Sequence, residues 1–498
     1  MERPIKMEEK KQSIARDGVG LTISQFITML LQIITSMLLS RFRSLEEFGT
    51  FSQIISAINL TYAFFSLGLP NSVNFFMGKA KNLGEKEKYV SVYFSFSTIL
   101  MIINGLFLVF CAPILVNYYK NTLINSFIYS LAVLPWTIMV IQSIELFFVI
   151  YGKTPKLMFF RLANGILLLS LIVIVQLMNW NFKIYMILYS LLEIGISITS
   201  FFIVRRMVGK INFRFDSHLI KRILTYSIPI SLSSFVGTIS VEMNKLFIGR
   251  FYSVEDYAIY SNAAKELPIA IIASALSLVS MPVIISYVMK KDNEKAINLW
   301  KNSTIMAFIF ICIISMGIFT FSREVISILY SSKYLPGVRV FQVYSLIPLL
   351  RCTYFGMILS SVGKTKLIFI NALVSLLINV ILIYPLFRLL GFYGPAVSTF
   401  ISLFVLVLFQ LLATSKAVKI RLSKIFPWIP IFLISIFCAS LGLFFSWIKT
   451  IITLDLIFSE EIESIILGII WCIIYFTALF PYIRKIWKSL SVSSESVN

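Results

Sequence analysis

The sequence predicts an all-α integral membrane protein with about fourteen transmembrane helices. Three observations support this fold class: an apolar composition, the lengths of the apolar runs and the placement of the basic residues. Hydrophobic residues make up 58% of the chain and charged residues 13%, compared with roughly 25% charged residues in a soluble domain. A water-soluble protein of 498 residues could not bury so much apolar surface, whereas hydrocarbon solvates it directly.

Apolar runs follow one another along the chain, each near the length of about 20 residues that crosses roughly 30 Å of hydrocarbon. Prolines inside several runs (Pro113, Pro135, Pro229, Pro268, Pro282 and Pro385) predict kinks or broken helices, which membranes tolerate inside a bundle. The predicted spans are Gly18–Ser40, Phe51–Gly78, Ser91–Val116, Ser126–Tyr151, Leu157–Met178, Ile184–Val204, Ile223–Ile248, Tyr257–Met289, Ile305–Phe321, Phe341–Val362, Leu367–Phe387, Gly394–Thr414, Trp428–Trp447 and Ile465–Tyr482.

The Lys and Arg residues set the predicted orientation. They occur in short clusters between the apolar runs, and alternate loops hold roughly three of them for each one in the other loops. We therefore expect both termini in the cytoplasm, together with the polar segment 205–222 that contains His218. Because the net charge of +21 is dispersed in this way, it indicates membrane topology rather than a nucleic-acid partner.

The chain also repeats itself. Leu39–Ser52 aligns with Ile248–Ser261, and Gly152-Lys-Thr precedes the fifth run as Gly363-Lys-Thr precedes the eleventh. Six crossings in each copy return the chain to the same side, so two parallel six-helix repeats should form two lobes that work by alternating access. We expect an N-lobe at residues 1–209, a C-lobe at 210–420 and two extra helices at 421–498.

Charged residues inside the predicted spans are the main candidates for a binding site, because a charge at a helix centre costs about 2.5 kcal/mol or more. Arg351 and Lys265 fall near mid-membrane, Glu266 follows Lys265, and Asn262 lies one helical turn before Glu266. Two readings stay open for these residues: contact with substrate, or an internal charge pair that holds the bundle together.

Other polar residues complete the candidate set. Glu242 and Lys245 are three residues apart and can pair on one helix face. For Lys245, as for Glu145 and Glu193, we favour a structural role. Asn71 and Asn74 beside Pro70 are assigned to the same cavity, although Asn next to Pro is more typical of a helix cap.

The sequence offers no sign of catalysis or of a bound cofactor. The five cysteines lie in apolar runs without a Cys-x-x-Cys pair, and His218 is the single histidine, so we expect no metal site. The Gly-Lys-Thr triplets lack the first glycine of a P-loop. An energy source should therefore be a proton gradient, a sodium gradient or the gradient of the substrate itself.

The repeated segment resembles the pattern that follows the first helix of oligosaccharide flippases, here Arg41, Glu46, Phe48 and Gly49. The stretch 68–72 (Gly-Leu-Pro-Asn-Ser) resembles the end of their second helix. The chain is thus similar to the MOP superfamily, and most similar to Wzx-type polysaccharide flippases. The second copy departs from the pattern, with Ala258 at the position of Gly49.

This resemblance implies two lobes in a V, a central cationic cavity and an undecaprenyl-(pyro)phosphate-linked oligosaccharide as substrate. It also implies a place in the bacterial inner membrane, with membrane lipids and polysaccharide polymerase machinery as partners. Lipid II flippases, which have two extra helices, and teichoic acid flippases are alternatives within the superfamily. The remaining alternatives are a MATE-type multidrug or cation exporter, a membrane enzyme and a nonenzymatic scaffold. A multidrug or cation exporter should have a net acidic cavity.

Overall fold

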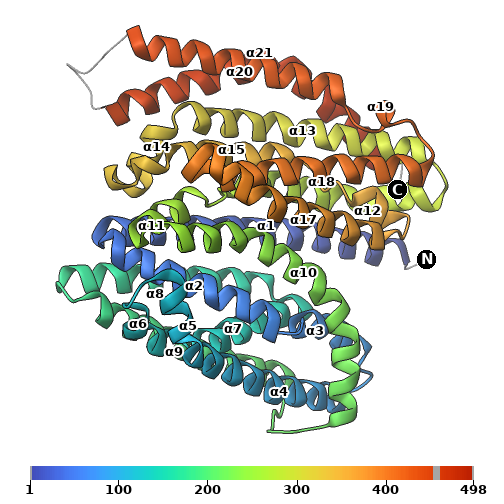
Figure 1. Ribbon diagram of the computed structural model, residues 1–498. Helices are drawn as coiled ribbons and strands as arrows, with labels where there is room; N and C mark the ends of the chain where they lie inside the picture. Colours follow the sequence, from blue (N-terminus) through green and yellow to red (C-terminus); the bar gives the residue numbers. More distant parts are fainter. Residues whose placement is uncertain (1–2, 452–459, 496–498) are drawn as a thin grey trace. The chain divides into compact units, whose positions relative to one another are not determined.

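The computed structural model describes residues 3–451 and 460–495, and within these ranges all regular secondary structure is helical. The chain divides into two compact units, 1–261 and 262–498 (Figure 1). Unit 1 contains α1 (Arg3–Phe42), α2 (Leu45–Phe65), α3 (Leu69–Lys79), α4 (Leu83–Phe110), α5 (Ala112–Tyr119), α6 (Ile124–Leu131), α7 (Leu134–Ile150), α8 (Thr154–Leu177), α9 (Phe182–Val208), α10 (Ser217–Phe251) and most of α11 (Val254–Ala263).

Unit 2 contains the remaining helices. They are η1 (Pro268–Ala270), α12 (Ile271–Met289), α13 (Asn293–Thr320), α14 (Ser322–Tyr330), η2 (Ser332–Gly337), α15 (Val338–Leu350), α16 (Met357–Ser361), α17 (Thr365–Leu390), η3 (Gly391–Tyr393), α18 (Gly394–Val418), α19 (Leu422–Ile425), α20 (Trp428–Ile451) and α21 (Glu460–Glu495). Helix α10 thus belongs to unit 1 by its contacts, although in the sequence it is part of the second copy of the repeat.

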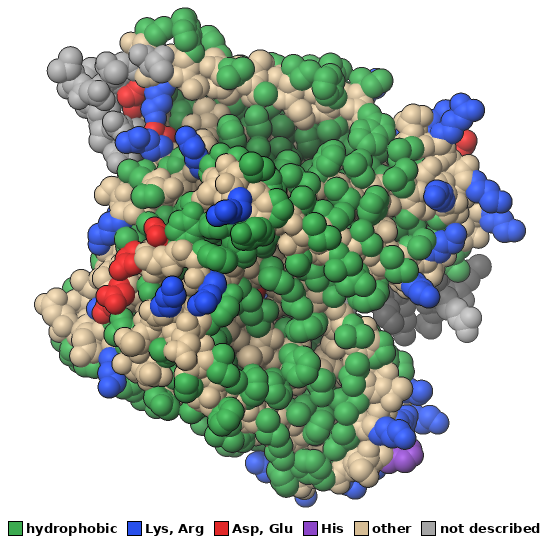
Figure 2. All heavy atoms as spheres, viewed as in Figure 1, with side chains coloured by type: hydrophobic (Ala, Val, Ile, Leu, Met, Phe, Trp, Pro, Cys, Tyr) green, Lys and Arg blue, Asp and Glu red, His purple; other side chains and the backbone are tan. Residues whose placement is uncertain are grey.

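Apolar helices of spanning length dominate both units. Within residues 3–451 and 460–495, ten helical segments are long and apolar enough to cross a membrane, or up to twelve if each of two bent pairs is one span. One of the ten segments, Thr365–Val418, comprises both α17 and α18. Hydrophobic side chains cover most of the visible face of each unit, with Lys and Arg gathered toward its margins (Figure 2). The protein is therefore a multi-pass membrane protein; the predicted count of fourteen spans is not confirmed.

Proline explains several of the breaks. Pro113 and Pro135 lie in the first turns of α5 and α7, and Pro268 begins η1, positions where the missing N–H of proline costs nothing. Pro229 lies inside α10, which is bent by 42° between its two halves, as is expected where proline removes a helical hydrogen bond. The predicted kinks and breaks are confirmed at these four positions.

Unit 1 is organised around α4 and α7, whose facing sides form an aromatic core with α2 and α3. Tyr93 on α4 is fully buried and shares a hydrogen bond of 2.7 Å with the Ser143 hydroxyl on α7. Along another side, α1 packs against α8, where a side chain on Gly165 would collide with Leu31. The absence of a side chain at Gly165 therefore lets these two helices approach closely.

The segment between α9 and α10 is held along α4. Backbone N–H groups of Lys210, Asn212 and Arg214 donate to Glu87, Ser91 and Ser95 in turn. The pairing is regular because two residues of the extended segment advance about as far as four residues of the helix α4, roughly 6 Å in each case. At its end, Asp216 caps α10 and pairs with Lys88 at 2.6 Å. The hydrogen bonds from Lys88 and from the Leu219 N–H lower the pKa of Asp216.

Unit 2 is built around α13, which packs against α12, α15, α20 and α21 (Figure 1). Tyr475 of α21 is buried and donates to the Ile309 carbonyl of α13 at 2.9 Å. Lys449 of α20 pairs with the buried Glu324 of α14. The two C-terminal helices are therefore joined to the rest of unit 2 by apolar packing and by a charge pair.

Candidate functional site

Arg351 lies where a membrane span predicted from the sequence, Phe341–Val362, breaks. Helix α15 ends at Leu350, residues 351–356 are not helical, and α16 begins at Met357. We expected Arg351 inside a continuous helix, and this is wrong: it is the C-terminal cap of α15. Pro348 weakens the last turn of α15 because proline has no N–H to donate. A cation is favoured at such a helix end, where carbonyl groups are left without partners.

Buried side chains hold this break in place. Trp300 of α13 donates from Nε1 to the Thr353 hydroxyl at 2.9 Å, and both residues are buried. Phe355 packs edge-to-face on the Trp300 ring, and Cys352 is buried beside it. The side chain of Arg351, in contrast, is 46% exposed. The fold thus anchors the segment and leaves its guanidinium group accessible.

The partner of Arg351 lies at a second break. Helix α11 ends at Ala263, and Lys265 and Glu266 follow in a non-helical stretch before Pro268. The expectation that Glu266 shares a helix face with Asn262 is therefore wrong: Leu267, the residue before Pro268, is extended, because a proline disfavours helical geometry in the residue that precedes it. Arg351 Nη1 donates to Glu266 Oε2 at 2.7 Å.

Lys265 and Asn262 form the second contact of this centre. Lys265 Nζ donates to the Asn262 Oδ1 at 2.8 Å, and Asn262 is buried. The Asn262 side chain also interacts with Tyr334 of η2. The structure thus brings four of the predicted residues (Arg351, Lys265, Glu266 and Asn262) into one centre in unit 2, with two cations and one carboxylate.

A separate polar cluster lies in unit 1, around the buried carboxylate of Glu242 on α10. Lys245 donates to Oε2 at 3.2 Å, which confirms the predicted pair. From α2, the Ser56 hydroxyl donates to Oε2 at 2.7 Å and the Asn59 amide donates to Oε1 at 3.1 Å. Glu242 therefore joins α2 to α10 through satisfied hydrogen bonds, as a buried carboxylate requires.

Two further intramembrane acids also have protein neighbours. Arg161 on α8 binds Glu145 on α7 through two hydrogen bonds of 2.9 and 2.7 Å, and it donates to Ser24 on α1. This bidentate pair agrees with the structural role expected for Glu145. Glu193 is buried on α9 beside Tyr189.

Asn71 and Asn74 are exposed on α3. The cap of this helix is Gly68, with φ of 68° and no side-chain hydrogen bond, so a capping role for Asn71 is wrong. A side chain on Gly68 would come within 2.6 Å of the Ser227 carbonyl oxygen of α10. Close packing of α3 on α10, together with the left-handed backbone, therefore explains a glycine there.

Four residues that contact the charged residues or stabilise the break were not predicted from the sequence, because their contacts are non-local: Ser56, Asn59, Trp300 and Thr353. Three of them, Ser56, Asn59 and Thr353, carry a hydroxyl or amide group, which is a possible sign of a polar contact within an apolar span. Such side chains are common, however, and the sequence does not show which residue each of them contacts. Among the described residues, no group of three or more His, Cys, Asp and Glu could hold a metal ion.

Comparison with known proteins gives a family match and several structural matches. The profile of the family described as "Polysaccharide biosynthesis protein" matches residues 38–339. The lipid II flippase MurJ in its inward closed conformation is 17% identical, with a TM-score of 0.72 over 93% of this chain and 99% of that one. No curated protein sequence gives a significant match.

Multidrug transporters match over a smaller part of the chain. An inward-facing MATE family transporter of the MOP superfamily is 16% identical, with a TM-score of 0.63 over 82% of this chain and 99% of that one. The MATE multidrug transporter DinF-BH is 12% identical, with a TM-score of 0.53 over 82% and 97% of the two chains. At these identities, the matches establish a shared fold.

Proposed function

Because this chain belongs to the family of polysaccharide biosynthesis proteins, whose profile covers residues 38–339, we propose that it is a flippase for a lipid-linked sugar. The proposed substrate is an anionic undecaprenyl-(pyro)phosphate-linked oligosaccharide. The protein carries it from the cytoplasmic to the outer face of the bacterial inner membrane by alternating access, with both termini of the protein in the cytoplasm.

The accessible guanidinium of Arg351 is the observation that carries this proposal. It lies at a broken span, with 46% of its side chain exposed, and it pairs with the carboxylate of Glu266. Lys265, held by Asn262, adds a second cation. Cations in a site of low dielectric attract phosphate far more strongly than they do in water. This centre therefore suits an anionic headgroup better than a hydrophobic cation.

In this mechanism the cations hold the phosphates while hydroxyl and amide groups contact the sugar. The headgroup crosses inside the protein, and the apolar tail stays in the bilayer. The sequence contains no nucleotide-binding motif, so the proposed energy source is an ion gradient or the gradient of the substrate.

A lipid II flippase is the second candidate. One specific observation favours it: the fold of MurJ matches 93% of this chain, whereas the MATE transporters match 82%. Lipid II is also a lipid-linked sugar on a pyrophosphate, so the same charged centre serves both candidates.

Depletion of the protein tests the proposal in cells. Lipid-linked glycan should accumulate on the cytoplasmic side and become inaccessible to an external lectin, and wild-type protein should restore it. Unchanged outward accessibility in a strain without a redundant flippase would refute a flippase role. A changed sensitivity to cationic dyes instead would favour a drug exporter.

A further inference from the structure

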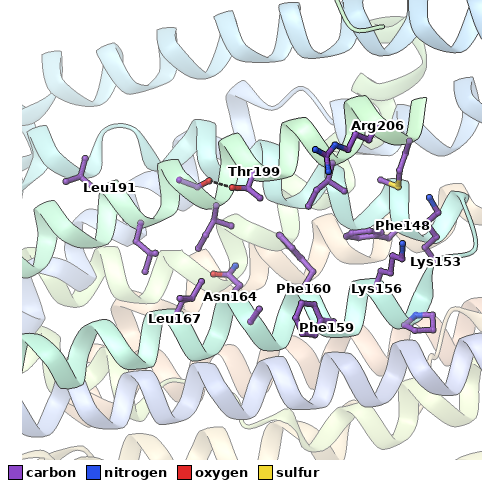
Figure 3. A pocket seen from close by; sticks show the side chains of 17 residues that line it. Phe148, Lys153, Lys156, Phe159, Phe160, Asn164, Leu167, Leu191, Thr199 and Arg206 are labelled. Atoms are coloured by element: carbon purple, nitrogen blue, oxygen red, sulfur yellow. Dashed lines mark hydrogen bonds between the residues drawn. The ribbon is translucent and has the colours of Figure 1, made fainter. Parts of the chain in front are cut away.

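A groove runs between α8 and α9 in unit 1 (Figure 3), and none of the residues of the charged centres described above lines it. Its volume is about 980 Å³, at the upper end of the range of roughly 300–1,000 Å³ for small-molecule sites. Phe159, Leu167 and Leu191 are exposed along it. The groove is therefore accessible and has exposed apolar side chains, which suit contact with hydrocarbon.

Small residues keep this groove open. Ala163 on α8 and Gly195 on α9 both line it, and an added side-chain carbon at Gly195 would meet no atom within 4 Å. The Thr199 hydroxyl donates to the Gly195 carbonyl, so it is satisfied within its own helix. Apart from the side chain of Asn164, the middle of the groove thus offers an apolar surface with free space.

One end of the groove is strongly basic. Lys153 just before α8, Lys156 near its start and Arg206 near the end of α9 all lie at this end (Figure 3). No acid is found among the described residues that line the groove, and no ion pair is found for these three cations within the described ranges. The lining thus combines a site for an anion with a long apolar channel.

The dimensions match one leaflet of a bilayer. From Lys156 to Leu167 the groove follows α8 for roughly 17 Å, at about 1.5 Å per residue. Half of a hydrocarbon core of about 30 Å is roughly 15 Å. A lipid with its phosphate at the basic end would therefore lay an acyl chain along the whole groove.

We propose that this groove binds an anionic phospholipid, with its phosphate at Lys153, Lys156 and Arg206 and an acyl chain between Ala163 and Gly195. Charge complementarity selects the anionic headgroup, since each basic residue near a membrane surface adds about 1 kcal/mol of attraction, roughly fivefold in affinity. The apolar channel selects a lipid over a soluble anion. Because neither Arg351 nor Glu242 lines the groove, the proposal does not depend on the proposed transport function.

Native mass spectrometry of the purified full-length protein tests this site. The protein is titrated with phosphatidylglycerol and with phosphatidylcholine that carry the same acyl chains. We expect retention of phosphatidylglycerol in preference to phosphatidylcholine. The triple variant Lys153→Gln, Lys156→Gln and Arg206→Gln should bind phosphatidylglycerol roughly 100-fold more weakly and lose the preference. All three side chains lie at the end of the groove, so folding should be unaffected.

A steric variant tests the apolar channel independently. Gly195→Phe should fill the groove and reduce retention of both lipids. Gly468→Phe is its matched control, because Gly468 on α21 also has no atom within 4 Å of an added side-chain carbon. A headgroup preference that survives in the triple variant would overturn the proposal, and so would unchanged lipid retention in Gly195→Phe. Displacement of the lipid by inorganic phosphate, or tighter binding of a polyprenyl phosphate, would also overturn it.

Discussion

Arg351 donates to Glu266 at 2.7 Å, and each of the two residues lies at a break between helices, Glu266 between α11 and η1 and Arg351 between α15 and α16. The pair therefore joins two breaks within unit 2. Non-helical backbone at membrane depth is tolerated only where it is buried in protein or lines a water-filled cavity. With the Arg351 side chain 46% exposed and that of Glu266 25% exposed, the pair is open to a ligand.

Replacement of Arg351 distinguishes a substrate contact from a structural charge pair. Arg351→Ala should reduce surface glycan roughly 10- to 100-fold, since a hydrogen bond to a charged group contributes about 1.5–3 kcal/mol. Protein levels should stay near normal because nearly half of the side chain is exposed. Arg351→Lys should retain part of the activity.

The double variant Arg351→Ala and Glu266→Ala is the control for the first prediction. If Arg351 only neutralises Glu266, removal of the carboxylate should restore activity. A substrate contact predicts no rescue. Surface glycan measured by lectin binding, normalised to protein level, separates the two outcomes, and full activity of Arg351→Ala alone would refute the assignment.

The cluster around Glu242 should be structural. Glu242→Ala leaves Lys245, Ser56 and Asn59 without their shared acceptor, so we expect a loss of about 1–3 kcal/mol in stability. Glu242→Gln keeps an acceptor oxygen and should lose less. Thermal unfolding in detergent measures both. Glu255→Ala, at an exposed position on α11, is the control and should leave the unfolding temperature unchanged. Equal unfolding temperatures for Glu242→Ala, Glu242→Gln and Glu255→Ala would contradict a structural role of Glu242.

Gly49 marks a contact between the two copies of the repeated segment. A side chain there would overlap the backbone carbonyl of Val254, which lies in the second copy. Gly49→Ala should therefore destabilise the protein by about 1–3 kcal/mol. Gly78→Ala on α3, where an added carbon meets no atom within 4 Å, is the matched control. A Gly49→Ala protein as stable as this control would show that the two copies can separate here without cost.

The membrane orientation can be measured with single cysteines in a cysteine-free protein. His218→Cys should resist an impermeant thiol reagent in intact cells, because the basic segment around it is predicted to be cytoplasmic. Ser332→Cys should be labelled. Both positions are exposed in the structure, so a lack of labelling reports the side of the membrane. The reverse pattern would invert the predicted topology.

Much of the architecture was predictable because a bilayer imposes simple length and composition rules. The runs Trp428–Trp447 and Ile465–Tyr482 correspond to α20 and α21. The pair of Glu242 and Lys245 followed from their spacing on one helix. Local rules of this kind need no knowledge of what packs against the helix.

The break at Arg351 was not predicted, and at Pro268 the sequence did not distinguish a kink from the complete break that holds Glu266; the reason is tertiary. Pro268 and Pro348 were visible in the sequence, but a proline in a membrane helix can produce a kink, as Pro229 does, or a complete interruption. The interruption after Leu350 is stabilised by the hydrogen bond from Trp300 to Thr353, residues far apart in the chain. The partners Ser56 and Asn59 of Glu242 were missed for the same reason.

Transport by the purified protein in vesicles tests the central claim most directly. The protein is reconstituted with a lipid-linked oligosaccharide, and the fraction of sugar that becomes accessible to a lectin on the opposite face is followed over time. We predict faster crossing with the wild-type protein than with Arg351→Ala or with protein-free vesicles. Vesicles in which the wild-type protein moves a cationic dye, yet moves the lipid-linked sugar no faster than protein-free vesicles do, would contradict the proposed function.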